Sequence, residues 1–124
     1  MKREIKGDTL AVMDDRENIV LTIKVSTTEG TTRLIVSGSI THDAAPEFED
    51  ELMSILTSRD KTMKHKVVVD FSALEHISAP ALQTLLTVQR LVDEDRFIFH
   101  IQNITGAVKE TFVQTGFIDL LEIR

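Results

Sequence analysis

The chain has 124 residues with 42% hydrophobic and 27% charged side chains, the size and balance of one globular domain. Its formal net charge of −6 at pH 7 disfavours nucleic acid binding, because an acidic surface repels phosphate backbones. The absence of cysteine excludes disulfides and thiolate metal sites, and no apolar run is long enough for a membrane span or signal peptide, so we expect a cytoplasmic protein.

Residues 1–17 are rich in charge apart from one short apolar stretch at residues 10–13. This composition leaves three interpretations open: a loose N-terminal arm, an extra edge strand, or part of a dimer contact. The regular pattern of a folded domain begins at Asn18. We therefore divide the chain into an arm or edge strand over residues 1–17 and a domain over residues 18–124.

Two β-branched segments, residues 19–25 and 34–36, predict neighbouring strands, and Gly30 between them supplies the turn of a hairpin. Beyond the second strand the apolar spacing changes to i, i+4, i+7 and i+8, which is typical of an amphipathic helix. We expect this helix to open near Pro46. The positions that carry the helical spacing are Phe48, Leu52, Ile55 and Leu56.

The second half of the chain alternates strand patterns with helix patterns. Predicted strands cover residues 67–71 and 97–101, and predicted helices cover residues 82–92 and 108–115. Thr105 is the predicted N-cap of the helix over residues 108–115, and Gly116 follows its end. Residues 117–123 close the chain as a strand or a short helix. The order ββαβαβα predicts an α/β fold. It consists of one mixed sheet of four to five strands, opened by an antiparallel hairpin, with helices packed mainly on one face.

Two sequence blocks carry a family resemblance. Residues 67–82, VVVDFSALEHISAPAL, are similar to a strand followed by Asp-x-Ser-x-Leu and a tight loop that opens a helix. Residues 103–117, NITGAVKETFVQTGF, are similar to a closing helix with a glycine-hydrophobic exit, and residues 38–48 add weaker support. Over roughly residues 18–123 the chain resembles the STAS family, the domain of sulphate transporters and bacterial anti-sigma-factor antagonists.

The resemblance implies a regulatory position at the start of the second helix. In anti-sigma-factor antagonists a serine there is phosphorylated by a partner kinase, and the added negative charge breaks the complex. Ala79 aligns with that serine and has no hydroxyl, so no phosphorylation is expected there, while Thr41 and Ser78 align with acidic residues of the family. A shift of one residue would make Ser78 the acceptor, but its place before Ala-Pro predicts a helix N-cap.

Other chemistry is only weakly indicated. The four histidines, His42, His65, His76 and His100, show no i, i+4 pair and have no cysteine to join them, so we assign no metal ligand. Asp70 is expected to accept hydrogen bonds from loop amides at the end of its strand. The sequence contains none of the common phosphate-binding or catalytic motifs, which disfavours an enzyme and a bound cofactor.

Together these patterns predict a non-catalytic, protein-binding regulatory module that resembles an anti-sigma-factor antagonist. The implied partner is a protein, an anti-sigma factor kinase or a related regulator, and we expect neither nucleic acid binding nor direct membrane insertion. The predicted contact surface combines a loop over residues 72–82, the helix that follows and a neighbouring loop. Its candidate residues are Thr41, His42, Ser72, Glu75, His76, Ser78, Ala79, Gln83 and Thr84.

Two alternatives remain open at this point. The exposed amide groups at the start of the second helix would suit an anion, which would make the chain a small-molecule or nucleotide-sensing STAS domain. STAS domains also occur in transport proteins, so the resemblance equally allows an accessory subunit of a lipid or anion transport assembly.

Overall fold

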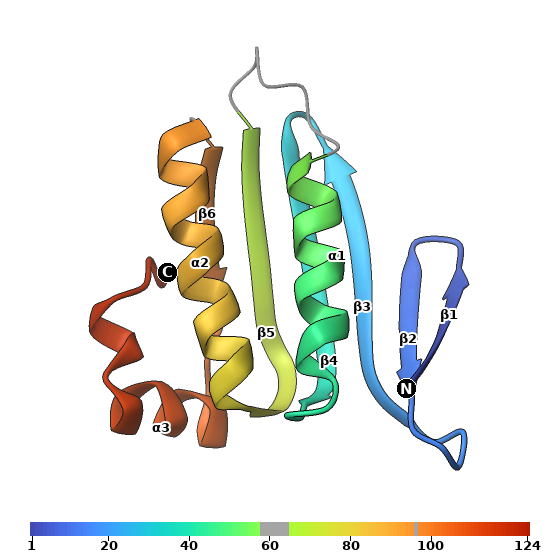
Figure 1. Cartoon of the computed structure of the whole chain (residues 1–124). Coiled ribbons are helices and arrows are strands. Elements are labelled where there is room, and N and C mark those ends of the chain that lie inside the picture. The colour runs from blue at the N-terminus through green and yellow to red at the C-terminus, as the bar shows by residue number, and fades with distance from the viewer. Residues whose placement is uncertain (58–64, 96) are drawn as a thin grey trace.

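A computed structural model describes residues 1–57, 65–95 and 97–124 of the chain (Figure 1). The described elements are β1 (Lys2–Lys6), β2 (Thr9–Met13), β3 (Ile19–Thr28), β4 (Thr31–Ile40), α1 (Ala45–Thr57), β5 (His65–Ile77), α2 (Ala79–Asp95), β6 (Phe97–Gln102), α3 (Gly106–Thr115) and a short 3₁₀ turn, η1 (Phe117–Asp119). None of the helices in these ranges has the length and hydropathy needed to cross a membrane.

The strands form one mixed sheet in the order β1-β2-β3-β4-β5-β6. The first four strands pair antiparallel, whereas β4, β5 and β6 pair in parallel. The described sheet therefore has six strands rather than the predicted four to five. The added strands come from residues 2–13, where Gly7 with a φ of 60° turns the chain between β1 and β2.

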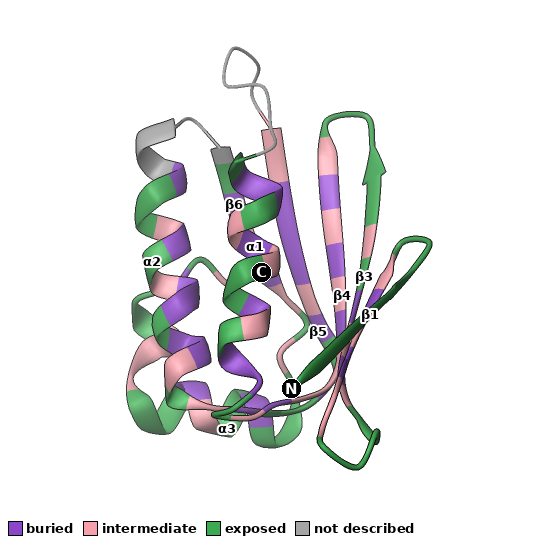
Figure 2. Ribbon diagram, turned by 45° about the vertical axis from the view of Figure 1, so that its right-hand side comes forward, coloured by how far each residue is buried: buried purple, intermediate pink, exposed green. Residues whose placement is uncertain are grey.

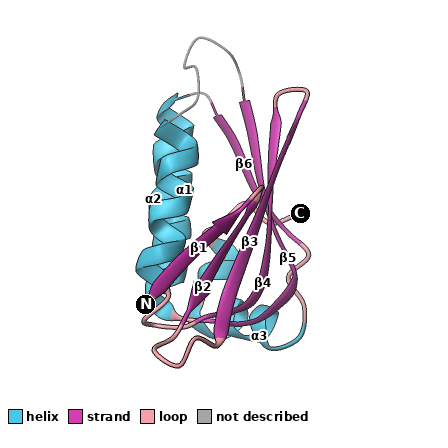
Figure 3. Ribbon diagram, turned by 90° about the vertical axis from the view of Figure 1, so that its right-hand side faces the viewer, coloured by secondary structure: helices cyan, strands magenta, loops and turns pink. Residues whose placement is uncertain are grey.

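The helices α1 and α2 cover one face of the sheet, as the predicted helix packing requires (Figures 1–3). All four apolar positions that predicted the first helix are buried in α1. Phe71 of β5 lies between two other rings, 6.4 Å from Phe48 of α1 and 6.5 Å from Phe112 of α3. Fully burying one such ring contributes roughly 1.5–3 kcal/mol, so these three residues are a main attachment of the helices to the sheet.

The end of β4 approaches β3 closely at Gly38. Gly38 has a φ of 92°, and a Cβ atom on it would lie 2.4 Å from the carbonyl oxygen of Val20. The pairing register of β4 with β5 shifts on either side of this region, between Ile35 and Ser37 and between Gly38 and Ser39. Such bulges bend a strand and increase its twist. They let β4 and β5 stay paired as far as the starts of the two long helices.

The strand β5 is longer than the sequence predicted. The prediction placed a loop over residues 72–82, but β5 continues to Ile77 and only Ser78 separates it from α2. The C-terminal part of β5 pairs with β4, for example His76 with Ser39, after the pairing with β6 has ended at Asp70. The loop prediction was wrong because buried residues recur there every third position, as the bulges require, instead of alternating.

The chain closes much as expected. The third helix, α3, has Thr105 at its N-cap position and Gly116 in the left-handed conformation after its end, with a φ of 82°. The Thr105 side chain makes no capping hydrogen bond. After α3 the short turn η1 forms, and Ile123 then makes an isolated parallel bridge to Ile101 of β6, so the last segment contains both a helical turn and an extended residue.

Candidate functional site

Ser78 joins the sheet to the second helix. Its backbone N–H donates to the carbonyl oxygen of Ile40 at the end of β4 (2.9 Å), and its own carbonyl oxygen accepts from the N–H of Leu82 (3.1 Å). Ser78 therefore occupies the predicted N-cap position of α2. Its Oγ atom is shielded from solvent and has no hydrogen-bond partner among the described residues, so the hydroxyl does not cap the helix.

The first turn of α2 presents small and rigid residues. Ala79 is the first helical residue and its side chain is exposed, and Gln83, one turn later, is exposed as well. Pro80 follows Ala79 inside the first turn, where its missing N–H leaves no helical bond unmade. Thr84 was predicted to be exposed but is only 6% exposed, and its hydroxyl donates to the carbonyl oxygen of Pro80 (3.1 Å).

The loop before α1 lies beside this turn. Thr41 holds the loop in place: its Oγ1 accepts from the N–H of Ala44 (3.1 Å) and its carbonyl oxygen accepts from the N–H of Ala45 (3.0 Å). His42 and Asp43 follow Thr41 and are exposed. These two hydrogen bonds satisfy backbone donors that the start of α1 would otherwise leave unpaired.

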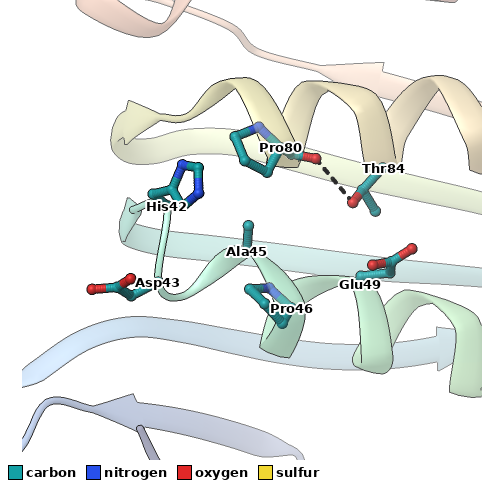
Figure 4. A pocket seen from close by; sticks show the side chains of 7 residues that line it. All are labelled: His42, Asp43, Ala45, Pro46, Glu49, Pro80 and Thr84. Atoms are coloured by element: carbon teal, nitrogen blue, oxygen red, sulfur yellow. Dashed lines mark hydrogen bonds between the residues drawn. The ribbon is translucent and has the colours of Figure 1, made fainter.

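A shallow depression of about 310 Å³ separates the starts of α1 and α2 (Figure 4). Its lining residues come from both helices and from the loop before α1: His42, Asp43, Ala45, Pro46, Glu49, Pro80 and Thr84. Sequence reasoning selected His42 and Thr84 among these and missed the others. Pro46 and Glu49 carried only helix signals, and the pairing of the two helix starts depends on a tertiary contact between distant segments.

The predicted site residues fall into two groups. Thr41, His42, Ser78, Ala79, Gln83 and Thr84 lie at or next to the two helix starts. Ser72, Glu75 and His76 are exposed but belong to the C-terminal part of β5, with Ala73 paired to Ser37 between them. The structure thus replaces the single predicted loop with a strand end and a helix start joined at Ser78.

Asp70 performs the structural role predicted for it. Its Oδ1 accepts from the backbone N–H of Ser72 (2.8 Å), and its Oδ2 accepts from Nδ2 of Asn103 (3.1 Å). The Arg33 guanidinium lies 3.6 Å from the same oxygen. Partial burial by itself would raise the pKa of Asp70, but the hydrogen bonds from Ser72 and Asn103 and the charge of Arg33 outweigh it, so the pKa lies below its ordinary value.

Replacing Asp70 with asparagine is expected to cost about 1 kcal/mol of folding free energy at neutral pH. Because the folded-state pKa of Asp70 is lowered, the carboxylate stabilises the fold above the unfolded pKa of about 3.8 and loses this effect as the pH falls through the lower folded value. Urea titrations of wild type and Asp70→Asn at several pH values should converge in acid. A constant gap down to the lowest pH would contradict the assignment.

The described residues contain no group of three or more histidine, aspartate or glutamate side chains placed to hold a metal ion. The helix starts present an exposed methyl group, two proline rings and an imidazole, with the carboxylates of Asp43 and Glu49 beside them. Such a mixture of rigid apolar groups and peripheral charge is typical of protein-binding surfaces.

The fold is that of a single small α/β domain with helices on one face of a mixed sheet. A family model described as "Mlab, STAS domain" matches residues 23–122. The chain therefore belongs to the STAS domain family, and the resemblance seen in the sequence is confirmed. No curated protein matches the sequence.

Solved structures share this fold at low sequence identity. An anti-sigma factor antagonist from Mycobacterium paratuberculosis superposes with a TM-score of 0.72 at 19% identity, covering 90% of this chain and 89% of that one. The anti-sigma factor antagonist SpoIIAA in its unphosphorylated form gives 0.64 at 12%, covering 82% and 87%. The murine anion transporter Slc26a9 gives 0.65 at 12%, covering 94% of this chain but 20% of the transporter.

Proposed function

We propose that this chain is a non-catalytic, cytoplasmic regulatory module that binds an anti-sigma factor kinase or a related regulator through the starts of α1 and α2. The observation that carries the proposal is the position of Ala79. It is the exposed first residue of α2, beside the depression that His42, Pro46 and Pro80 line. The similarity of the fold to anti-sigma factor antagonists supports the choice of partner.

In this proposal the usual phosphate switch does not operate at the start of α2. Ala79 has no oxygen to accept a phosphate, and the hydroxyl of its neighbour Ser78 is shielded from solvent. A kinase would have to open the junction between β5 and α2 to reach it, against the backbone bonds of Ser78 to Ile40 and Leu82. The module would therefore be competent to bind whenever it is folded.

The groups around the depression suggest how a partner is recognised. His42, Pro46 and Pro80 offer rigid surfaces that lose little conformational freedom on binding, and Asp43 and Glu49 suit a basic rim on the partner. The two carboxylates also argue against the alternative of an anion or nucleotide sensor at this place, because they would repel the ligand's phosphate groups.

Replacing His42 with alanine is expected to weaken partner binding about tenfold, because it removes an exposed ring that lines the depression at the proposed contact. Titration calorimetry with an anti-sigma factor kinase from the same organism would measure the change. Lys24→Ala, at an exposed position on β3, is the matched control and should bind like wild type. Equal affinities for all three proteins would contradict the proposed surface.

Two observations favour a second candidate function. The matching family model carries the description Mlab, and the likeness to Slc26a9 shows that this fold also occurs within an anion transporter. An accessory subunit of a lipid or anion transport assembly is therefore the alternative. Co-purification of the intact chain with a membrane ATPase, together with failure to bind the kinase, would favour this alternative over the first proposal.

A further inference from the structure

The strand β1 forms an open edge of the sheet. All five of its residues are exposed, and β2 on one side is its single neighbour in the described sheet (Figure 2). An unpaired edge offers a row of backbone N–H and C=O groups to another strand. The edge is held to the domain by Arg3, whose guanidinium lies 3.1 Å from Glu47 and 3.4 Å from Glu51 of α1.

The hairpin geometry shows which residues of β1 face outward. Lys6 and Thr9 flank the two-residue turn between β1 and β2, so they form a hydrogen-bonded pair. Hydrogen-bonded and non-hydrogen-bonded pairs alternate along an antiparallel ladder. Arg3 and Ile5 therefore direct their backbone N–H and C=O groups away from β2 and toward the free edge.

The charges along β1 are complementary to those of a second copy of β1 that runs antiparallel to it. In an antiparallel pair of β1 strands centred on Ile5, Glu4 lies opposite Lys6 of the second copy and Lys6 lies opposite Glu4 of the second copy. A pair centred on Glu4 would instead set Glu4 against Glu4 and Lys2 against Lys6, and a pair centred on Arg3 would set Arg3 against Arg3. Opposite charges directly across an antiparallel pair stabilise it and like charges destabilise it, which selects the register centred on Ile5.

We propose that two copies of this chain associate through antiparallel pairing of their β1 strands, centred on Ile5, to form one sheet that runs through both copies. The backbone geometry is compatible, because Ile5 is one of the two residues that face the free edge. Ile5 is also 68% exposed, more than any other large hydrophobic residue in the described part of the chain, and the pairing would bury it against Ile5 of the second copy.

The oligomeric state of suitable variants tests the proposal. Sedimentation velocity of the whole chain should show a dimer that dissociates on dilution, and Ile5→Lys should be monomeric at the same concentrations. Ile19→Lys is the matched control, since Ile19 on β3 is 64% exposed but does not lie on the edge strand, and it should dimerise like wild type. Thermal melts should confirm that both variants are folded.

A charge exchange tests the register itself. Glu4→Lys should raise the dimer dissociation constant about tenfold, because two opposite-charge pairs become like-charge pairs. The double variant Glu4→Lys with Lys6→Glu restores both pairs and should return the constant to the wild-type value. A monomeric wild type, a dimeric Ile5→Lys variant, or a double variant no tighter than Glu4→Lys would overturn the proposal.

Discussion

Introducing a carboxylate at position 79 is expected to weaken partner binding about a hundredfold, which corresponds to about 2.8 kcal/mol. The Ala79 side chain is exposed at the start of α2, next to the proposed contact surface. In the complex, the carboxylate of Ala79→Asp would lose its hydration without gaining a partner placed for it. The helix itself should tolerate the change, because a negative charge in the first turn interacts favourably with the helix dipole.

Two further substitutions at the same position separate charge from size. Ala79→Asn has nearly the shape of Ala79→Asp without its charge and should lose much less affinity, while Ala79→Ser should bind like wild type when no ATP is present. Calorimetry of the three variants with one partner preparation provides the comparison. Wild-type affinity for Ala79→Asp would place the partner elsewhere on the domain.

Replacing Gly38 with alanine is expected to destabilise the folded chain by roughly 3 kcal/mol. The residue sits at a φ of 92°, a backbone conformation that side chains other than glycine rarely adopt, and a methyl group would lie 2.4 Å from the Val20 carbonyl oxygen. Because this neighbour is backbone of the adjacent strand, relief would require β3 and β4 to move apart. Chemical denaturation of Gly38→Ala against wild type would measure the loss.

Gly30→Ala serves as the control for this effect. Gly30 also has a positive φ, 78°, but nothing lies within 4 Å of the position that a Cβ atom would occupy. Its replacement should cost only the conformational strain, about 1–2 kcal/mol. If the two variants were equally destabilised, the close approach of β3 to β4 at Gly38 would not be the cause.

The elements that the sequence predicted correctly are those in which the spacing of apolar residues directly indicates which side chains are buried. The period of Phe48, Leu52 and Ile55 indicated α1, and all three are buried as expected. Gly116 after α3 was also identified from the sequence, because helices commonly end at a residue in the left-handed conformation and glycine adopts this conformation readily. Helices and turns of this kind are encoded locally, so a single sequence is sufficient to find them.

The parts that were missed depend on contacts between distant segments. The strand β1 was expected only as one of three interpretations of residues 1–17, because it has no buried residue and no apolar pattern marks it. Its attachment through Arg3 to Glu47 and Glu51 joins positions far apart in the sequence. The extension of β5 to Ile77 depends on bulges in its pairing with β4. Thr84 was predicted to lie on the contact surface, but it is only 6% exposed in the folded domain.

The backbone hydrogen bond from the N–H of Ser78 to the carbonyl oxygen of Ile40 bears on how fast a partner can bind. It makes the starts of α1 and α2 parts of one block, since β4 leads directly into the loop of α1 and Ser78 leads directly into α2. If the proposed partner binds this surface in the shape seen here, encounters should succeed without a slow rearrangement step. Affinity differences among variants of this surface should consequently appear in how long the complex lasts, while association rates stay nearly constant.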